Sequence, residues 1–202
     1  NPDSSFGESS WEKPESKMVQ ISVGQALSKG NFEADQIDMA FAGDLLNQCI
    51  GSVYGLRDLG IPFVGLYGAC STMAESLALA ALFVDTSIAK KALAVTSSHF
   101  CSAERQFRFP LEYGGQRPPT AQWTVTGSGT TILAKDGPGP YITHITQGKI
   151  VDNGIKDANN MGAAMAPAAY ETIRAHLDDF SLSPEDYDLI VTGDLGQVGD
   201  AE

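Results

Sequence analysis

The stretch IPFVGLYGACSTMAESLALAALFVD, residues 61–85, decides the fold class. Residues 61–68 form an apolar run that is typical of a buried strand. From Cys70 the chain is dense in Ala and Leu without an interior Gly or Pro, which predicts a buried helix. Gly68 and Ala69 permit a tight turn between the two. We therefore expect a strand that leads directly into a helix beginning at or just after Cys70.

Strand and helix patterns alternate along the rest of the chain. Residues 1–16 are polar and are predicted to form a loop. Apolar spacing predicts helices at 17–29, 49–60 and 167–179, and strands at 37–45, 91–100, 124–135, 141–150 and 188–194. The two strands flanking the DGPGP turn (136–140) are candidates for a hairpin. This alternation indicates an α/β protein with a largely parallel sheet and helices on its faces.

A long internal repeat divides the chain. FEADQIDMAFAGDL (32–45) matches LSPEDYDLIVTGDL (182–195) in an acidic turn, an apolar strand and a final Gly-Asp-Leu. We interpret residues 1–150 as a first half and residues 151–202 as the start of a similar second half. The second copy of the GACST segment would lie beyond the last residue, so we expect the second half to be truncated.

The composition restricts the partners that we expect. The formal net charge of −12 opposes direct binding to nucleic acid or to an anionic bilayer. The three cysteines, Cys49, Cys70 and Cys101, have no metal-ligand spacing, which predicts reduced thiols in a cytosolic compartment and no metal site. With no apolar run long enough for a membrane span and no visible signal segment, the sequence predicts a soluble chain.

Cys70 is the centre of the predicted site. A thiol at the N-terminus of a helix lies at the positive end of the helix dipole, which favours a thiolate or a bound anion. Ser71 and Thr72 are expected to satisfy the first helical N–H groups. The alternative is that Cys70 is a small buried residue of the core.

Three further candidate residues lie where apolar strands end. The carboxyl ends of parallel strands meet at one edge of a sheet, so His99, Asp44 and Asn47 are predicted to line the same cleft as Cys70. The alternatives are a histidine that is hydrogen-bonded at a strand end and an aspartate that caps the following helix.

Residues 101–123 form a long polar segment with several Gly and Pro residues, which makes it a candidate binding loop. Arg105, Arg108 and Arg117 lie close together in this segment of a strongly acidic chain. Because arginine pairs with carboxylates in a bidentate geometry, the segment is expected to bind an acidic small molecule. The alternative is that neighbouring glutamates hold these arginines in structural ion pairs.

Several motifs together carry a family resemblance. A strand that ends in GACST before an Ala-rich helix, a two-half repeat and a later GSG strand (127–129) resemble the thiolase superfamily of condensing enzymes. Within it, TSSH (96–99), AERQFRFPLEYGGQ (103–116) and DYDLIVTGDL (186–195) resemble the stage V sporulation protein AD family of spore-forming bacteria. The resemblance covers nearly the whole chain.

This resemblance implies a thiolase-like fold in which duplicated βαβαβ halves form layers α-β-α-β-α, incomplete in this chain, and a homodimer. It also implies binding of dipicolinic acid (pyridine-2,6-dicarboxylate), with or without calcium and without another cofactor, and support for its uptake into the developing spore. The expected protein partners are other products of the stage V sporulation A operon. The expected location is peripheral, on the cytoplasmic side of the spore inner membrane.

By position, Cys70 matches the nucleophile of the condensing enzymes. Those enzymes also need a histidine where this sequence has Thr192, Gly193 and Asp194, so the resemblance favours a binding protein over an enzyme. The expected ligand residues are Cys70, Ser71, His99, Arg105, Arg108, Asp44 and Asn47. Two alternatives stay open: an acyl-transferring enzyme of the ketoacyl synthase type that uses Cys70, and a scaffold that only docks other sporulation proteins.

Overall fold

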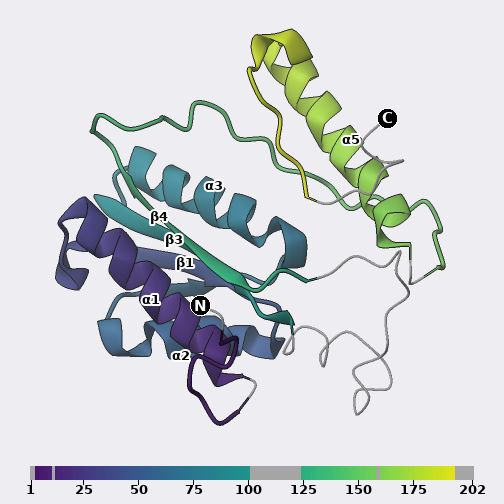
Figure 1. Cartoon of the computed structure of the whole chain (residues 1–202). Coiled ribbons are helices and arrows are strands. Elements are labelled where there is room, and N and C mark those ends of the chain that lie inside the picture. Colours follow the sequence, from purple (N-terminus) through teal and green to yellow (C-terminus); the bar gives the residue numbers. More distant parts are fainter. Residues whose placement is uncertain (1–2, 11, 101–123, 158–159, 194–202) are drawn as a thin grey trace. The chain divides into compact units, whose positions relative to one another are not determined.

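The computed structural model describes residues 3–10, 12–100, 124–157 and 160–193, which belong to two compact units. The first unit extends to Pro140 and the second begins at Tyr141. The strands of the first unit are β1 (Met39–Gly43), β2 (Phe63–Gly65), β3 (Lys91–Ser98) and β4 (Gly127–Ala134). They lie in the order β2-β1-β3-β4, with β4 antiparallel and the others parallel (Figure 1). The predicted α/β class and largely parallel sheet are confirmed.

Helices cover both faces of this sheet. Helix α1 (Lys13–Gly30) and helix α2 (Ile50–Leu56) pack on one face, and helix α3 (Thr72–Asp85) packs on the other (Figure 1). The first unit therefore has three layers, α-β-α.

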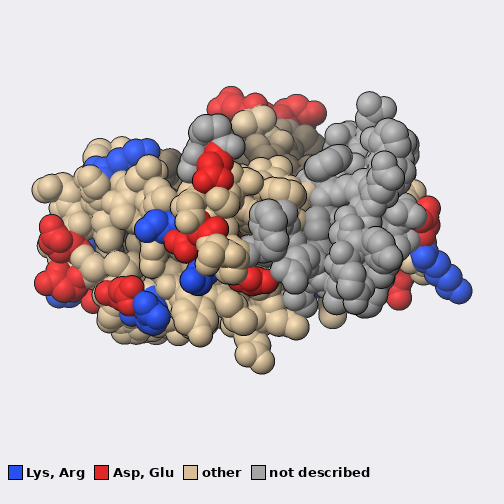
Figure 2. All heavy atoms as spheres, turned by 60° about the horizontal axis from the view of Figure 1, so that its bottom comes forward, with Lys and Arg blue, Asp and Glu red and all other residues tan. Residues whose placement is uncertain are grey.

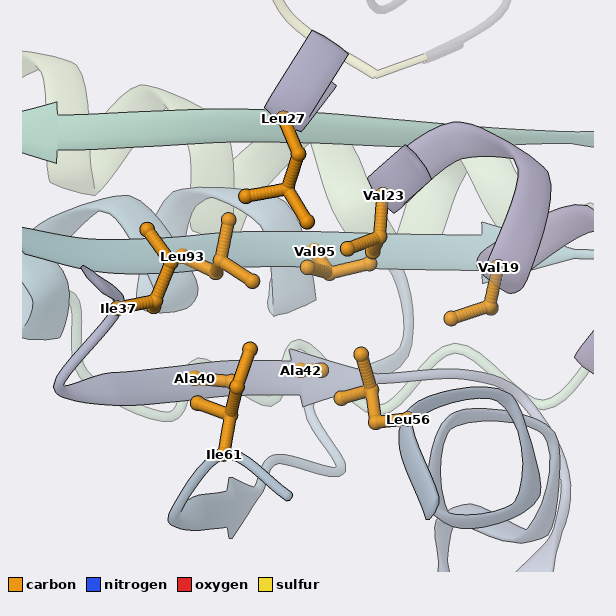
Figure 3. Packing of buried hydrophobic residues seen from close by; sticks show 10 residues of the cluster. All are labelled: Val19, Val23, Leu27, Ile37, Ala40, Ala42, Leu56, Ile61, Leu93 and Val95. Atoms are coloured by element: carbon orange, nitrogen blue, oxygen red, sulfur yellow. The ribbon is translucent and has the colours of Figure 1, made fainter. Parts of the chain in front are cut away.

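Side chains alternate along the central strands between two cores. Ala40 and Ala42 of β1 contribute to the core on the α1 side. Phe41 contributes to the α3 side, where its ring meets that of Phe83 edge-to-face at 4.9 Å. Figure 3 shows the α1-side cluster, which consists of Val19, Val23, Leu27, Ile37, Ala40, Ala42, Leu56, Ile61, Leu93 and Val95. A strand that is covered on both faces is apolar throughout, which is why the sequence identifies β1 and β3.

Helix α1 begins at Lys13, inside the segment that the sequence analysis predicted as a loop. The reason is Pro14, which occupies the first turn, where a helix needs no N–H from its residues and where proline already has the helical φ. Pro14 and the following Glu15 are both buried. The N-terminal segment therefore contributes to the packed unit.

Strand β2 is an edge strand and not the buried strand predicted for residues 61–68. Only Phe63–Gly65 pair with β1, and Val64 and Gly65 are exposed. Three residues of the apolar run contribute to the cores: Ile61 joins the α1-side core, Phe63 packs against it, and Leu66 packs against the α3-side core. Local hydrophobicity does not encode the position of a strand within a sheet, so the prediction of full burial was wrong.

The predicted hairpin between 124–135 and 141–150 is also wrong. Strand β4 pairs over its whole length with β3, from Ser98 opposite Gly127 to Lys91 opposite Ala134. Residues 141–150 form no strand.

The second unit contains helix α5 (Met161–Phe180), which starts before the predicted 167–179 and includes Pro167 in its interior. The side chain of Asn160 caps it by accepting a hydrogen bond from Ala163 N–H at 3.2 Å. The predicted strand 188–194 is not formed over its described residues, 188–193. Because a strand is defined by its hydrogen-bonded partner, an apolar sequence without a partner stays irregular.

Candidate functional site at the start of α3

Cys70 lies in a 3-10 turn, Ala69–Ser71, between β2 and α3. The Ser71 N–H donates to the Gly68 carbonyl oxygen at 3.1 Å and closes the turn, in which Ala69 has a left-handed φ of 50°. Strand β2 ends before this turn and does not lead directly into the helix as predicted. The Cys70 thiol is free and exposed, so it is not the buried core residue of the alternative interpretation.

No side chain caps the first turn of α3, contrary to the role predicted for Ser71 and Thr72. The Ser71 hydroxyl instead lies 2.8 Å from the Gly68 carbonyl oxygen and 2.9 Å from Oε1 of Glu75. Thr72 Oγ1 is buried and has no hydrogen-bond partner in the part of the chain that the structure describes. The contact with Ser71 holds the carboxylate of Glu75 beside the turn that contains Cys70. Its negative charge there disfavours the binding of an anion.

Asp44 caps α2, the role that the sequence analysis gave as its alternative. Its carboxylate is buried; Oδ1 accepts from Leu46 N–H at 2.9 Å, and Oδ2 accepts from the N–H and the hydroxyl of Ser52, both at 2.7 Å. Asn47 is exposed in the short turn Asn47–Cys49 that precedes α2. That either residue contacts a ligand stays a prediction.

His99 directly follows β3 and is fully buried. Its Nε2–H donates to the Ser4 carbonyl oxygen at 2.9 Å, and its ring stacks on that of Phe100 at 5.1 Å. The structure thus joins His99 to the N-terminal segment, which matches the alternative of a hydrogen-bonded histidine at a strand end.

Sequence reasoning missed Glu15, a fully buried carboxylate at the start of α1. Its Oε1 accepts from the Ser97 hydroxyl near the end of β3 at 3.0 Å. A Cβ added to Gly51 would lie 3.0 Å from Cγ of Glu15 and 3.1 Å from Cγ of Asp44, so the side chains of both acidic residues flank this glycine. The available signal was Pro14, which marks a helix start and places Glu15 in its first turn.

The predicted cationic loop lies outside the described residues, and so do Arg105 and Arg108. Their contact with a ligand stays a prediction. Thr192 and Gly193, where the resemblance led us to expect a histidine in an enzyme, are exposed, and the Thr192 hydroxyl donates to the Gly193 carbonyl oxygen at 2.9 Å.

The two described cysteines differ sharply in environment. Cys49 is buried and its thiol donates to the Leu66 carbonyl oxygen at 3.1 Å. Burial raises the pKa of the Cys49 thiol, and the nearby charge of Asp44 raises it further. Cys70 is exposed.

Alkylation should separate these two thiols. We expect iodoacetamide at pH 8 to modify Cys70 about tenfold or more faster than Cys49, because the Cys49 thiol is buried and its burial raises its pKa. Peptide-resolved mass spectrometry after timed quenching measures both rates. In urea the two rates should converge, and equal rates in the folded protein would contradict the environments described.

Neither a metal cluster nor a membrane span is found in the described residues. No group of three or more His, Cys, Asp or Glu side chains there is placed to hold a metal ion. None of the described helices has the length and hydrophobicity needed to cross a bilayer.

The fold is similar to that of condensing enzymes of known structure. A single-substitution variant of OleA from Xanthomonas campestris matches with a TM-score of 0.67 and 15% identity, over 92% of this chain and 61% of that one. The 3-oxoacyl-[acyl-carrier-protein] synthase III of Aquifex aeolicus matches with a TM-score of 0.56 and 14% identity, over 86% and 59%. The predicted thiolase-like fold, incomplete in this chain, is confirmed.

Sequence comparison gives the family. Stage V sporulation protein AD of Bacillus subtilis is 51% identical over 190 residues, which are 94% of this chain and 56% of that protein. The chain thus spans little more than half the length of this curated relative. The family model for stage V sporulation protein AD matches residues 1–201. The chain therefore belongs to the stage V sporulation protein AD family.

Proposed function

We propose that this sporulation protein binds dipicolinate beside Cys70 and supports its uptake into the developing spore. The observation that carries the proposal is the exposed Cys70 at the uncapped start of the 14-residue helix α3. The positive end of a helix dipole attracts small anions, and the first N–H groups of a helix have no acceptor within it. Family membership adds the sporulation context.

Dipicolinate is a flat dianion with two carboxylates. One carboxylate is proposed to accept from the Cys70 N–H and the Ser71 hydroxyl. The other is proposed to pair with Arg105 and Arg108, because arginine forms the strongest and best oriented bonds to carboxylates. His99, Asp44 and Asn47 are proposed to border the site. No metal is required, and a titration with and without calcium tests whether calcium contributes.

Glu75 provides a test in which the substitution is expected to raise the affinity for dipicolinate, whereas loss of a ligand residue lowers it. Its carboxylate lies 2.9 Å from the Ser71 hydroxyl, so it repels a dianion bound there. Glu75→Gln keeps an acceptor for Ser71 and removes the charge. We expect this variant to bind dipicolinate about three- to tenfold more tightly in calorimetric titration.

The matched control is Asp85→Asn, which removes one negative charge at the far end of the same helix. Its affinity should stay within about twofold of wild type. Ser71→Ala, which removes the hydroxyl proposed to donate to the ligand, and Arg105→Ala should weaken binding about tenfold. If Glu75→Gln behaves like Asp85→Asn and Ser71→Ala binds normally, the site is not at the start of α3.

The second candidate function is acyl transfer. The fold shared with OleA and the synthase III favours it, together with the exposed thiol of Cys70, which the sequence resemblance matches to the nucleophile of the condensing enzymes. Incubation with a series of acyl-coenzyme A donors should then give a thioester on Cys70, detected as a mass increase that Cys70→Ala abolishes. Absence of an adduct with every donor would remove this candidate.

We further propose that the protein acts as a homodimer on the cytoplasmic side of the spore inner membrane, held there by other products of the stage V sporulation A operon. Co-purification with those proteins from sporulating cells tests this location. Retention of the complex by Arg105→Ala would separate docking from ligand binding. A protein that stays in the supernatant of membrane preparations would contradict the peripheral location.

A further inference from the structure

The chain contains a single Asn-Gly pair, Asn153–Gly154, which belongs to the second unit. Both residues are exposed, and residues 151–157 form neither a helix nor a strand. Gly154 has a φ of 71°, in the left-handed region that glycine adopts without strain. Water therefore reaches both the amide side chain of Asn153 and the peptide nitrogen that follows it.

An asparagine side chain reacts with the following peptide nitrogen when that nitrogen can approach the amide carbon. The Gly154 nitrogen would lose its proton to hydroxide and form a bond to Cγ of Asn153. The side-chain nitrogen of Asn153 then takes up a proton and leaves as ammonia, which closes a succinimide ring. Water opens this ring at either carbonyl carbon and yields aspartate or isoaspartate. The net reaction consumes one water molecule, releases one ammonia and needs no oxidant or other reactant.

Glycine favours this reaction because it has no Cβ to crowd the attacking nitrogen and because its backbone rotates most freely. Two other asparagines lack this neighbour. Asn47 is also exposed, but Gln48 follows it. Asn31 is followed by Phe32, whose N–H donates to a carbonyl oxygen of α1 at 2.9 Å. Exposure alone is therefore shared with other asparagines, whereas the following glycine is particular to Asn153.

The structure adds a restraint on the attacking nitrogen. The Gly154 N–H donates to Oδ1 of Asp152 at 2.8 Å. This hydrogen bond holds the proton that must leave, and the carboxylate charge opposes a negative charge on the nitrogen beside it. All three residues of this contact, 152–154, are exposed, so water competes for the hydrogen bond. Asp152 therefore slows the attack without preventing it.

We propose that Asn153 is a site of spontaneous deamidation and isoaspartate formation, and that Asp152 slows this reaction. Aspartate at this position adds a negative charge at the surface, where it keeps its hydration. Exposed acidic side chains are already visible on the face of the molecule that Figure 2 shows. Isoaspartate instead adds a methylene group to the backbone of the segment that precedes α5. The proposal does not depend on ligand binding at Cys70.

Ageing of the protein in mildly alkaline buffer, followed by tryptic digestion and mass spectrometry, tests the proposal. Trypsin cleaves after Lys149 and Lys156, so Asn153 is the only asparagine in its peptide. We expect this peptide to deamidate about tenfold or more faster than the peptides with Asn47 or Asn31. Methyl transfer by an isoaspartate methyltransferase should label the same peptide. Equal rates at the three asparagines, or a product without isoaspartate, would overturn the proposal.

Two variants separate the attack from its restraint. Gly154→Ala should slow deamidation about tenfold or more, because the added Cβ obstructs the nitrogen. Asp152→Ala should speed it about two- to tenfold, because the N–H is released and the charge is removed. The control Asp136→Ala removes an exposed carboxylate outside this segment and should stay within about twofold of wild type. An unchanged rate in Gly154→Ala, or a rate in Asp152→Ala no higher than in the control, would contradict the proposal.

Discussion

Replacement of Asp44 by alanine is expected to lower the free energy of unfolding by about 3 kcal/mol, because each buried donor left without a partner costs about 1–3 kcal/mol. The variant would leave the N–H of Leu46, and both the N–H and the hydroxyl of Ser52, without their hydrogen-bond acceptor. Leu46 lies in the connection from β1 and Ser52 lies in the first turn of α2, so the loss affects how α2 is anchored. Urea denaturation of the variant and the wild type measures the difference.

Asn47→Ala is the matched control, since Asn47 belongs to the same connection but is exposed. It should change the free energy of unfolding by less than about 0.5 kcal/mol. Asp44→Asn should fall between the two, because an amide offers only one acceptor oxygen. Equal stability of Asp44→Ala and Asn47→Ala would show that the carboxylate does not cap α2.

Gly43→Ala is expected to be similarly destabilising, by about 3 kcal/mol. An added Cβ at this last residue of β1 would overlap the backbone carbonyl oxygen of Leu66 and would lie 2.7 Å from Cγ2 of Thr72. The Leu66 carbonyl cannot move freely, because it accepts from the Cys49 thiol at 3.1 Å. The strain would therefore displace the segment that leads to Cys70.

Gly24→Ala is the control for this substitution. Gly24 lies in the interior of α1 with no atom within 4 Å of an added Cβ, so alanine should stabilise the protein by about 0.5–1 kcal/mol. Opposite signs for the two Gly→Ala variants are the expected outcome. A neutral Gly43→Ala would mean that β1 and the Leu66 segment approach less closely than described. It would also leave the turn of Cys70 undisturbed.

The central strands and helices could be predicted because their burial requires apolar residues, which are visible in the local sequence. Strand β1 and the first half of β3, residues 92–95, are apolar runs, and α3 is an Ala- and Leu-rich segment that ends near the predicted residue. Gly60 marks the end of the predicted helix 49–60; it follows the short turn Arg57–Leu59 after α2, and its φ of 67° is one that glycine adopts without strain.

Features that depend on distant partners could not be predicted. Val64 is exposed because β2 has a neighbour on one side only, and nothing in its own sequence records this. Residues 141–150 and 188–193 have strand-like patterns but no paired strand among the described residues. The alternation of apolar and polar residues indicates which side chains share one face of a strand. Which of the two faces is covered is settled only when a partner strand fixes the register.

The candidate site was predicted in part. The position of Cys70 just before α3 follows from the motif, but its exposure and the intervening turn do not. The sequence located Asp44 and His99 at the ends of strands. It could not show that both side chains make structural hydrogen bonds, because this required the distances to Ser52 and to Ser4. The influence of Glu75 was not foreseen, because its link to Ser71 depends on how the turn places the hydroxyl.

The most direct test is a crystal structure of the full-length protein grown with dipicolinate. The proposal predicts density for the ligand at the start of α3, with one carboxylate within hydrogen-bond distance of the Cys70 N–H and an arginine from 101–123 on the other. A ligand bound only elsewhere, or a saturated crystal with nothing at this turn, would contradict the central claim.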